Sequence, residues 1–476
     1  MAYGPHTPAD REAMLAALGI TSVEPLFADI PTPVRADGLA LPEPEPELQL
    51  AARLEGLAGR NRVDLASFLG AGVYRHYVPA AVDQILLRGE FYTAYTPYQP
   101  EVSQGTLQTI YEYQSLLAEL TGLDVVSASH YDGAAATAEA ALMAIRATRR
   151  RRVLVSRAVH RHYVETTRTY FAAAELALEE LPTTADGTTD LAALADALAD
   201  AERPVAAVLL GQPNAFGLLE PMAEAAELAH AAGALFVAVV EPVSLAVLAP
   251  PGSYGADIAS GEGQPLGIAP QYGGPYLGVL ACREALVRQI PGRLVGRTTD
   301  LEGKRAFVMT LRAREQDIRR ERAASNICTN QALCALAATV YVACLGPHGL
   351  RDVGALGAAR ARELERALAA AGAPRLHRAP YLNEFAVQVP GAVRVHAALL
   401  EHGVLAGLPL ARWYPDDPQL REALLVCATE VTTTAEIERF AAALAAVRDG
   451  AAAADRTGSV AAAGSPASVT TARGGS

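Results

Sequence analysis

Residues 205–240 read VAAVLLGQPNAFGLLEPMAEAAELAHAAGALFVAVV and join two short apolar runs through a helical segment. The first apolar run covers 205–210, the second covers 235–240, and the helical pattern covers 221–232. Further apolar runs of the same kind stand at 153–156 and 276–282. Short apolar runs that alternate with helical segments are typical of parallel strands covered by helices. The sequence therefore predicts an α/β fold with a mostly parallel sheet.

Two longer helices are predicted before the first of these strands. Ser103 is a suitable N-cap, and Gly122 is a suitable residue to end the helix. Between them, apolar residues recur at helical spacing, namely at Leu107, Ile110, Tyr111, Leu117 and Leu120. Asp132 and Gly133 then open an alanine-rich segment that we expect to be helical to about residue 147.

The composition along the chain divides it into four parts. Residues 1–60 form a polar arm interrupted by prolines, and residues 61–330 contain the strand and helix alternation. Residues 331–448 are expected to form a smaller C-terminal α+β domain, which opens with an apolar helix that ends at Gly346 and Pro347. Residues 449–476 are rich in Ala, Gly, Ser and Thr, so we expect a disordered tail.

Charge and cysteine content exclude several classes of protein. The formal net charge of −12 over 476 residues argues against a nucleic-acid partner, because phosphate binding needs a basic face. The five cysteines form no CxxC pair, which favours reduced thiols over a disulfide framework or a zinc site. We expect no secretory signal at residues 1–6, MAYGPH, which contain neither a basic nor an apolar region. The apolar stretches of the whole chain are interrupted by Gly, Pro or charged residues before they reach the length of a membrane span. We therefore expect a cytoplasmic protein without a membrane segment.

One connecting segment is unusually rich in tyrosine. Residues 91–105 read FYTAYTPYQPEVSQG, which adds two threonines and two glutamines to the tyrosines. Tyrosine combines an apolar ring with a polar tip and is suited to lining a wet cleft or an interface. Packing of a simple loop is the alternative explanation of this spacing.

Several ungapped motifs of this chain closely resemble the glycine cleavage system P-protein. These motifs are PHT (5–7), FADIP (27–31), YTPYQPEVSQG (95–105), YDG (131–133), PGRLVG (291–296), RAREQDIRR (312–320), SNICTNQ (325–331) and NEF (383–385). Together they extend over about residues 5 to 448. The resemblance is to the α-type subunit of the two-subunit bacterial form, glycine dehydrogenase (decarboxylating) subunit 1.

The resemblance implies a fold, a reaction and partners. The family has the fold-type-I transferase fold of enzymes that depend on pyridoxal phosphate (PLP). Its complex decarboxylates glycine, releases CO2 and passes the aminomethyl group to the lipoyl arm of H-protein. In the split form, PLP is held by a lysine of subunit 2, and subunit 1 carries no cofactor of its own. Subunit 2, lipoylated H-protein and glycine are therefore the expected partners, in a heterotetramer.

The position of the PLP lysine is taken by Gln264, within the motif SGEGQPLG at 260–267. A Schiff base with PLP needs a primary amine, which glutamine does not supply. Lys304 is the only lysine in the chain. An independent PLP enzyme that uses Lys304 is the rival hypothesis, although no strand end supports that lysine.

A degenerate cofactor site is expected around two further positions. Glu241 follows the apolar run 235–240, where the resemblance implies the carboxylate that pairs with the pyridinium nitrogen. An ordinary structural role is the alternative for Glu241. The start of the helix at Asp132 is the expected equivalent of the phosphate site, but the Asp132 carboxylate would repel an anion.

We expect the tyrosine-rich loop to reach the active site of subunit 2. Tyr95 and Tyr98 would pack around the cofactor or the aminomethyl carrier, and Thr96 and Gln104 would supply hydrogen bonds. A third hypothesis assigns the chain a binding function without a role in catalysis. In that case the chain serves only as a docking surface for H-protein.

Two other features carry weaker signals. His160 and His162 could suggest a metal pair, but no third ligand follows at useful spacing, so packing is favoured and no metal site is expected. Five arginines could bind phosphate or a partner's carboxylates, or could form a solvated charged face. They are Arg312, Arg314, Arg319, Arg320 and Arg322.

Overall fold

The computed structural model of the chain describes residues 4–36, 38–271 and 273–462, in two compact units, Met1–Val63 and Asp64–Ser476. In the first unit, α1 (Pro8–Ala17) begins with a capping box between Thr7 and Asp10, and α2 (Glu47–Ala58) follows the proline-rich segment. Neither helix contains a buried residue.

The second unit is built on a seven-stranded sheet in the order β2-β8-β7-β6-β5-β3-β4. All neighbouring pairs from β4 to β7 are parallel, and the pairs that involve β8 are antiparallel. The predicted mostly parallel sheet is therefore confirmed. Its strands are β2 (Val125–Val126), β3 (Arg152–Ser156), β4 (Ala177–Leu181), β5 (Val205–Gln212), β6 (Leu235–Val240), β7 (Ile258–Glu262) and β8 (Gly278–Cys282).

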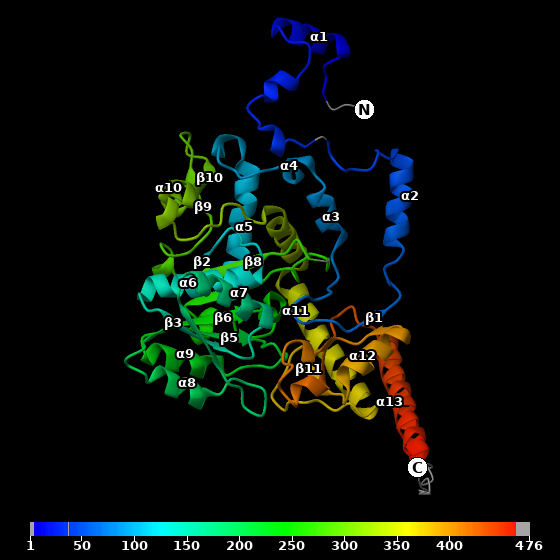
Figure 1. The fold of residues 1–476 in the computed structure, drawn as a ribbon. Coiled ribbons are helices and arrows are strands. Elements are labelled where there is room, and N and C mark those ends of the chain that lie inside the picture. The colour runs from blue at the N-terminus through cyan, green and yellow to red at the C-terminus, as the bar shows by residue number, and fades with distance from the viewer. Residues whose placement is uncertain (1–3, 37, 272, 463–476) are drawn as a thin grey trace, which may run out of the picture. The chain divides into compact units, whose positions relative to one another are not determined.

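The central strand β6 is buried on both faces. Phe236, Ala238 and Val240 pack in one cluster with α9 (Met222–Ala231) and α8 (Leu191–Leu198). Val237 and Val239 pack on the opposite face with α6 (Gly133–Thr148) and α7 (Arg161–Ala173). Figure 1 shows the two pairs of helices on opposite sides of the sheet. A strand covered on both faces reads as a continuous apolar run, which is why this sequence pattern was informative.

The two helices predicted before the sheet are present with the expected ends. α5 (Gln104–Thr121) follows Ser103 and ends at Gly122, which has φ 65°. A left-handed residue at this place is most easily glycine, because no Cβ opposes that conformation. α6 is capped by the side chain of Asp132, which accepts a hydrogen bond from the backbone nitrogen of Ala135. Shorter helices before α5 are α3 (Ala80–Leu86) and α4 (Gly89–Tyr92).

The long helix α11 (Ala332–Ala370) has a break at Gly346, whose φ of 61° and ψ of −176° are not helical. The first half therefore ends where the sequence predicted. A second half starts at Pro347, because a proline is well suited to the first turn of a helix. Among the described residues, α11 alone is long and apolar enough to span a membrane, with a mean hydropathy of 1.6 over 18 residues. Half of that window is buried and packs within the protein, as core helices of this composition do.

A smaller sheet follows α11. It contains β11 (Glu384–Gln388), β14 (Ala423–Cys427) and β13 (Leu408–Pro409) in that order, all antiparallel. α12 (Ala392–Glu401) packs here, and α13 (Thr434–Ala462) extends into the range that the sequence assigned to a disordered tail. Residues 463–476 lie outside the described residues, and the domain boundaries at 330 and 448 stay predictions. Two more pairs of strands are β1 (Ala66–Ser67) with β12 (Val404–Leu405), and β9 (Leu294–Thr299) with β10 (Arg305–Thr310).

Candidate functional site

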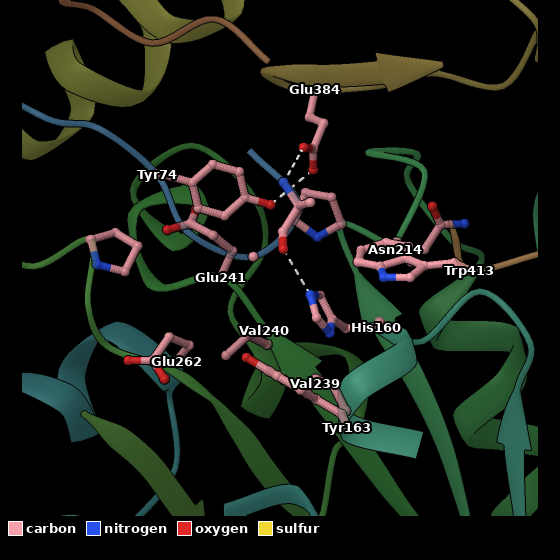
Figure 2. A pocket seen from close by; sticks show the side chains of 16 residues that line it. Tyr74, His160, Tyr163, Asn214, Val239, Val240, Glu241, Glu262, Glu384 and Trp413 are labelled. Carbon is pink, nitrogen blue, oxygen red and sulfur yellow. Dashed lines mark hydrogen bonds between the residues drawn. The ribbon is translucent and has the colours of Figure 1, made fainter. Parts of the chain in front are cut away.

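A cavity of about 60 Å³ lies at the carboxyl ends of β5, β6 and β7 (Figure 2). Open α/β sheets bind their ligands at this edge. Gly211, Val240 and Glu262 come from the three strands, and Glu384 and Trp413 come from the C-terminal part of the chain. The other lining residues are Ala71, Gly72, Tyr74, His160, Tyr163, Pro213, Asn214, Ala215, Val239, Glu241 and Pro265.

Glu384 closes one side of the cavity. Its Oε1 atom accepts a hydrogen bond from the backbone nitrogen of Ala71 at 2.6 Å, and its Oε2 atom accepts one from the Tyr74 hydroxyl at 2.9 Å. Burial raises the pKa of Glu384 to about 7, although both hydrogen bonds favour the carboxylate. The residue therefore anchors the segment before α3 to β11, as Figure 2 shows.

Gln264 anchors the same segment from the other side. The backbone nitrogen of Tyr74 donates to Gln264 Oε1 at 3.0 Å. Gln264 Nε2 donates in turn to the carbonyl oxygens of Tyr74 at 3.0 Å and Ile268 at 2.6 Å. Since the residue is only 1% exposed and its amide is satisfied on both atoms, Gln264 acts as a structural brace in this chain.

Glu262 lies at the N-terminus of α6. Its Oε2 atom accepts a hydrogen bond from the backbone nitrogen of Gly133 at 2.9 Å. Its Oε1 atom accepts from the backbone nitrogens of Gln264 at 2.9 Å and Leu277 at 2.8 Å. Burial raises the pKa of Glu262 to about 7, with a smaller contribution from the nearby Asp132 carboxylate. Three backbone donors from separate segments thus converge on one internal carboxylate.

Glu241 and His160 have partners within the protein. Both carboxylate oxygens of Glu241 accept backbone hydrogen bonds, from Val243 at 2.9 Å and Ser244 at 2.7 Å. Burial raises the pKa of Glu241 and lowers the pKa of His160 to about 4. The His160 ring is therefore neutral near pH 7, and its Nε2 atom lies 2.8 Å from the carbonyl oxygen of Ala71. The bonds of Glu241 are those of a cap for the short helix that follows.

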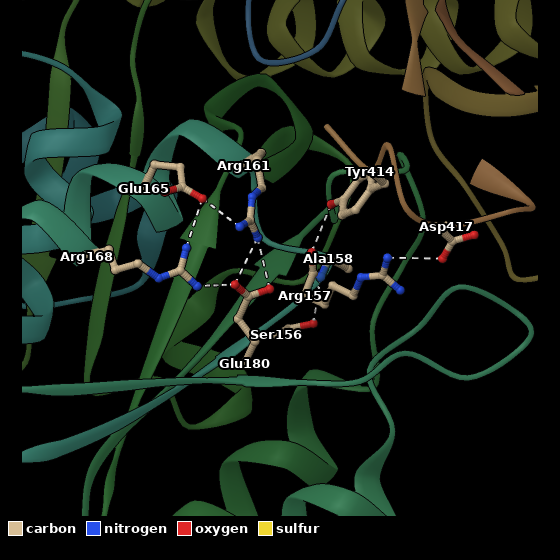
Figure 3. Close-up of polar contacts among 9 residues, drawn as sticks. All are labelled: Ser156, Arg157, Ala158, Arg161, Glu165, Arg168, Glu180, Tyr414 and Asp417. Carbon is tan, nitrogen blue, oxygen red and sulfur yellow. Dashed lines mark hydrogen bonds and ion pairs between the residues drawn. The ribbon is translucent and has the colours of Figure 1, made fainter. Parts of the chain in front are cut away.

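Next to the cavity-lining Trp413, Tyr414 and Asp417 make polar contacts with Arg157, the residue that follows β3 (Figure 3). The Tyr414 hydroxyl donates to the carbonyl oxygen of Arg157 at 2.9 Å, and the Arg157 guanidinium pairs with Asp417 at 3.0 Å. The same guanidinium lies 5.0 Å from the centre of the Tyr414 ring. A neighbouring network pairs Arg161 and Arg168 with Glu165 and Glu180. The network extends from α7 to β4.

These residues do not fit a phosphate-bearing cofactor. Pockets that bind small-molecule ligands and cofactors usually have volumes of about 300–1,000 Å³. This cavity has a volume of about 60 Å³, which is several times smaller. A phosphate would also need the backbone donors at the α6 N-terminus, but Glu262 already occupies the Gly133 nitrogen. Bringing a second anion beside Glu262 and Asp132 would be electrostatically unfavourable.

Lys304 is not part of this cavity. It stands in the turn between β9 and β10, its side chain is 74% exposed, and its ammonium pairs with Glu302 at 2.5 Å. The rings of His160 and His162 pack edge to face 5.2 Å apart. No group of three or more His, Cys, Asp or Glu side chains that could hold a metal occurs among the described residues.

The tyrosine-rich loop contributes no residue to the cavity. Tyr95 is 75% exposed and Tyr98 is 43% exposed. Thr96 and Tyr98 both accept hydrogen bonds from Arg293, at 3.0 and 3.1 Å. Gln104 pairs with the backbone of Phe307 through both atoms of its amide, at 2.9 Å each. Thr96 and Tyr98 are thus bound to Arg293, and Gln104, the first residue of α5, is bound to β10. Tyr95 is more exposed than Tyr98.

Arg293 is the residue of this region that sequence reasoning missed. It belongs to the motif PGRLVG, which was noted only for its resemblance. The arginines singled out instead have different surroundings. Arg312 lies 5.1 Å from the centre of the Tyr98 ring, and Arg314 donates to the carbonyl oxygen of Gly292 at 3.1 Å. Arg322 is 80% exposed at its side chain, as in a solvated face.

Comparison with known families and proteins gives one consistent result. The family model described as "Glycine cleavage system P-protein" matches residues 1–444 of the chain. The chain is 53% identical over 447 residues to a probable glycine dehydrogenase (decarboxylating) subunit 1 of Moorella thermoacetica, covering 93% of this chain and 99% of the relative. It is 48% identical over 453 residues to the protein of the same name from Desulfitobacterium hafniense, covering 94% and 100%.

Solved structures agree with the sequence comparisons. A crystal structure of glycine decarboxylase (P-protein) of the glycine cleavage system, in inhibitor-bound form, superposes with a TM-score of 0.86 at 45% identity. It covers 94% of this chain and 100% of that chain. A Burkholderia pseudomallei sphingosine-1-phosphate lyase superposes with a TM-score of 0.63 at 17% identity, covering 91% and 98%. At that identity, the second likeness shows the fold alone, and it confirms the fold-type-I architecture.

Proposed function

Because the chain belongs to the glycine cleavage system P-protein family, we propose that it is the subunit of a heteromeric glycine decarboxylase that holds no PLP. The complex decarboxylates glycine, releases CO2 and passes the aminomethyl group to the lipoyl arm of H-protein. Glycine dehydrogenase subunit 2 is the partner that holds PLP. We place the complex, a heterotetramer of two copies of each subunit, in the cytoplasm.

The observation that carries this proposal is the internal occupation of the degenerate cofactor pocket. Gln264, at the position that we assign to the PLP lysine, has both atoms of its amide bonded within the chain. The Glu262 carboxylate takes the backbone donor that a phosphate would need at the start of α6. PLP supplies an electron sink for decarboxylation when it is bound. In this complex, that chemistry falls to subunit 2, and this chain alone is expected to be inactive.

The task that we assign to this chain is to complete the active site of subunit 2. The 95–104 loop would cover the cleft, with Tyr95 and Tyr98 beside the cofactor or the aminomethyl carrier. Thr96 and Gln104 would supply hydrogen bonds or hold the loop in place. A covered cleft excludes water from the reactive carbon left after decarboxylation. The exposure of Tyr95, at 75%, supports a role outside the fold of its own chain.

The location of the cofactor tests the proposal directly. The reconstituted complex is reduced with borohydride in the presence of PLP, and the peptides of both chains are mapped by mass spectrometry. We expect the label on subunit 2 alone, and native mass spectrometry should give two copies of each chain. A label on Lys304 of this chain, at one equivalent per chain, would overturn the proposal. Reduction of this chain without subunit 2 is the control.

A further inference from the structure

Arg293 is a buried arginine that holds the 95–104 loop by two hydrogen bonds. It is only 5% exposed. Its Nη1 atom donates to Thr96 Oγ1 at 3.0 Å, and its Nη2 atom donates to the Tyr98 hydroxyl at 3.1 Å. Because both bonds come from one planar group, they fix Thr96 and Tyr98 relative to each other. Lysine has a single ammonium without this fixed fork, so it could not replace the arginine here.

Glu315 compensates the charge of this buried arginine. Its two carboxylate oxygens lie 3.8 Å from Arg293 Nε and 3.9 Å from Arg312 Nε. The same two guanidinium groups lie 5.4 and 5.1 Å from the centre of the Tyr98 ring. Cation–π contacts of this kind add attraction to the hydrogen bonds. The ring of Tyr98 is thus fixed by both arginines, and only part of it faces solvent.

The elements that carry Arg293 are themselves tied to α5. The backbone nitrogen of Ala128 donates to the Arg293 carbonyl oxygen at 2.8 Å, just before β9. The side-chain amide of Gln114 pairs with both backbone groups of Val295, at 3.0 Å each. The Gln104 amide pairs in the same way with Phe307 on β10. Side-chain hydrogen bonds from α5 therefore reach both β9 and β10.

These contacts separate the four loop candidates into two kinds. Thr96, Tyr98 and Gln104 bond within their own chain. The Tyr95 hydroxyl makes no hydrogen bond to any residue that the structure describes, and the residue is 75% exposed. We infer that Arg293 is the positioning residue of the 95–104 loop, and that Tyr95 is the side chain this loop presents to the active site of the partner subunit. The inference rests on the proposed function.

The test measures exchange between glycine and labelled bicarbonate in the complex of this chain with subunit 2, PLP and H-protein. Arg293→Lys should lower kcat roughly tenfold or more, because a loop displaced by about 1 Å misplaces the groups at the reacting atoms. The KM for glycine should stay within about twofold, since substrate binding depends on subunit 2. Arg297→Lys is the matched control, because Arg297 is an exposed arginine of the same strand region.

A double-mutant cycle shows whether Arg293 acts through the loop. When Thr96→Val and Tyr98→Phe are already present, adding Arg293→Lys should lower kcat by a further factor of less than about two. The two hydroxyl groups that accept hydrogen bonds from Arg293 are already absent in that background. An equal loss in both backgrounds would overturn the inference. If Arg293→Lys does not assemble, the Thr96→Val/Tyr98→Phe complex decides, and an unchanged kcat there would sink the inference. An inactive wild-type complex would instead count against the proposed function.

Discussion

The Oε2 atom of Glu262 lies 2.9 Å from the backbone nitrogen of Gly133, the first residue of α6. The N-terminus of a helix in this position is a ready site for an anion, because its backbone donors and its dipole both favour negative charge. Here a carboxyl group of the protein itself takes that position. This relationship supports the proposal that the cofactor is held by the partner subunit, independently of the glutamine at position 264.

Substitution of Glu262 should change how stability depends on pH. The pKa of Glu262 is raised from 4.5 to about 7, so between these values the folded chain binds more protons than the unfolded chain. Unfolding free energy therefore decreases as pH rises from 5 to 8, by roughly 3 kcal/mol for a shift of this size. Glu262→Gln removes this part of the decrease. Urea denaturation at several pH values measures it.

The Glu262→Gln variant keeps the contribution of Glu384, whose pKa is also raised to about 7. Its stability should therefore still fall with pH, but less steeply than in the wild type. Glu302→Gln is the control for loss of an exposed carboxylate. Parallel curves for the wild type and Glu262→Gln from pH 5 to 8 would contradict the assignment.

A lysine introduced at position 264 should not create a cofactor site. In Gln264→Lys, the Glu262 carboxylate still occupies the α6 N-terminus, and the cavity is still too small. Borohydride reduction with PLP should therefore leave the introduced lysine without label at near-stoichiometric PLP. Wild-type subunit 2 is the positive control. Full labelling of the introduced lysine under the same conditions would show that the amine alone was missing.

Tyr74→Phe should destabilise the chain measurably. The change removes the hydroxyl that donates to Glu384 at 2.9 Å and leaves one oxygen of a buried carboxylate without that partner. Loss of a hydrogen bond to such a group costs about 1–3 kcal/mol. Urea denaturation near pH 8 measures the loss. Tyr77→Phe serves as the matched control, since Tyr77 is 66% exposed and should change stability by less than about 0.5 kcal/mol.

Gln104→Ala should loosen the contact between α5 and β10. It removes two hydrogen bonds to the Phe307 backbone and leaves both backbone groups without their amide partner. We expect faster amide hydrogen exchange at Phe307 and a loss of about 1–3 kcal/mol in unfolding free energy. Gln108→Ala, on the exposed side of the same helix, is the control. Equal rates of amide hydrogen exchange at Phe307 in the two variants would contradict a role of Gln104 in holding α5 to β10.

Local sequence patterns were sufficient to predict four of the seven strands of the large sheet, namely β3, β5, β6 and β8, but not β2, β4 and β7. β6 was predicted with its observed ends because a strand buried on both faces is apolar at every position. The ends of α5 and α6 were predicted because Gly122 and Asp132 stop or cap a helix through bonds within one turn. The second half of α11 was missed, since Gly346 and Pro347 look like a final stop in sequence.

The contacts of the candidate site could not be predicted in the same way. Glu262 and Gly133 are 129 residues apart, and Arg293 and Thr96 are 197 residues apart. Nothing in the local pattern around Glu262 distinguishes a carboxylate that replaces an external anion from one on the surface. The resemblance to the family pointed to the 95–104 loop, but the division of its residues into anchors and an exposed tyrosine needed the structure.

The most direct test of this account is carbon exchange between glycine and labelled bicarbonate, with PLP and H-protein present. This chain alone, subunit 2 alone and the mixture of the two are compared at equal active-site concentration. We predict exchange in the mixture and none with this chain alone, because Glu262 takes the backbone donor at the start of α6 and Gln264 supplies no amine for a Schiff base. Exchange by this chain alone would contradict the central claim that it completes an active site held by its partner.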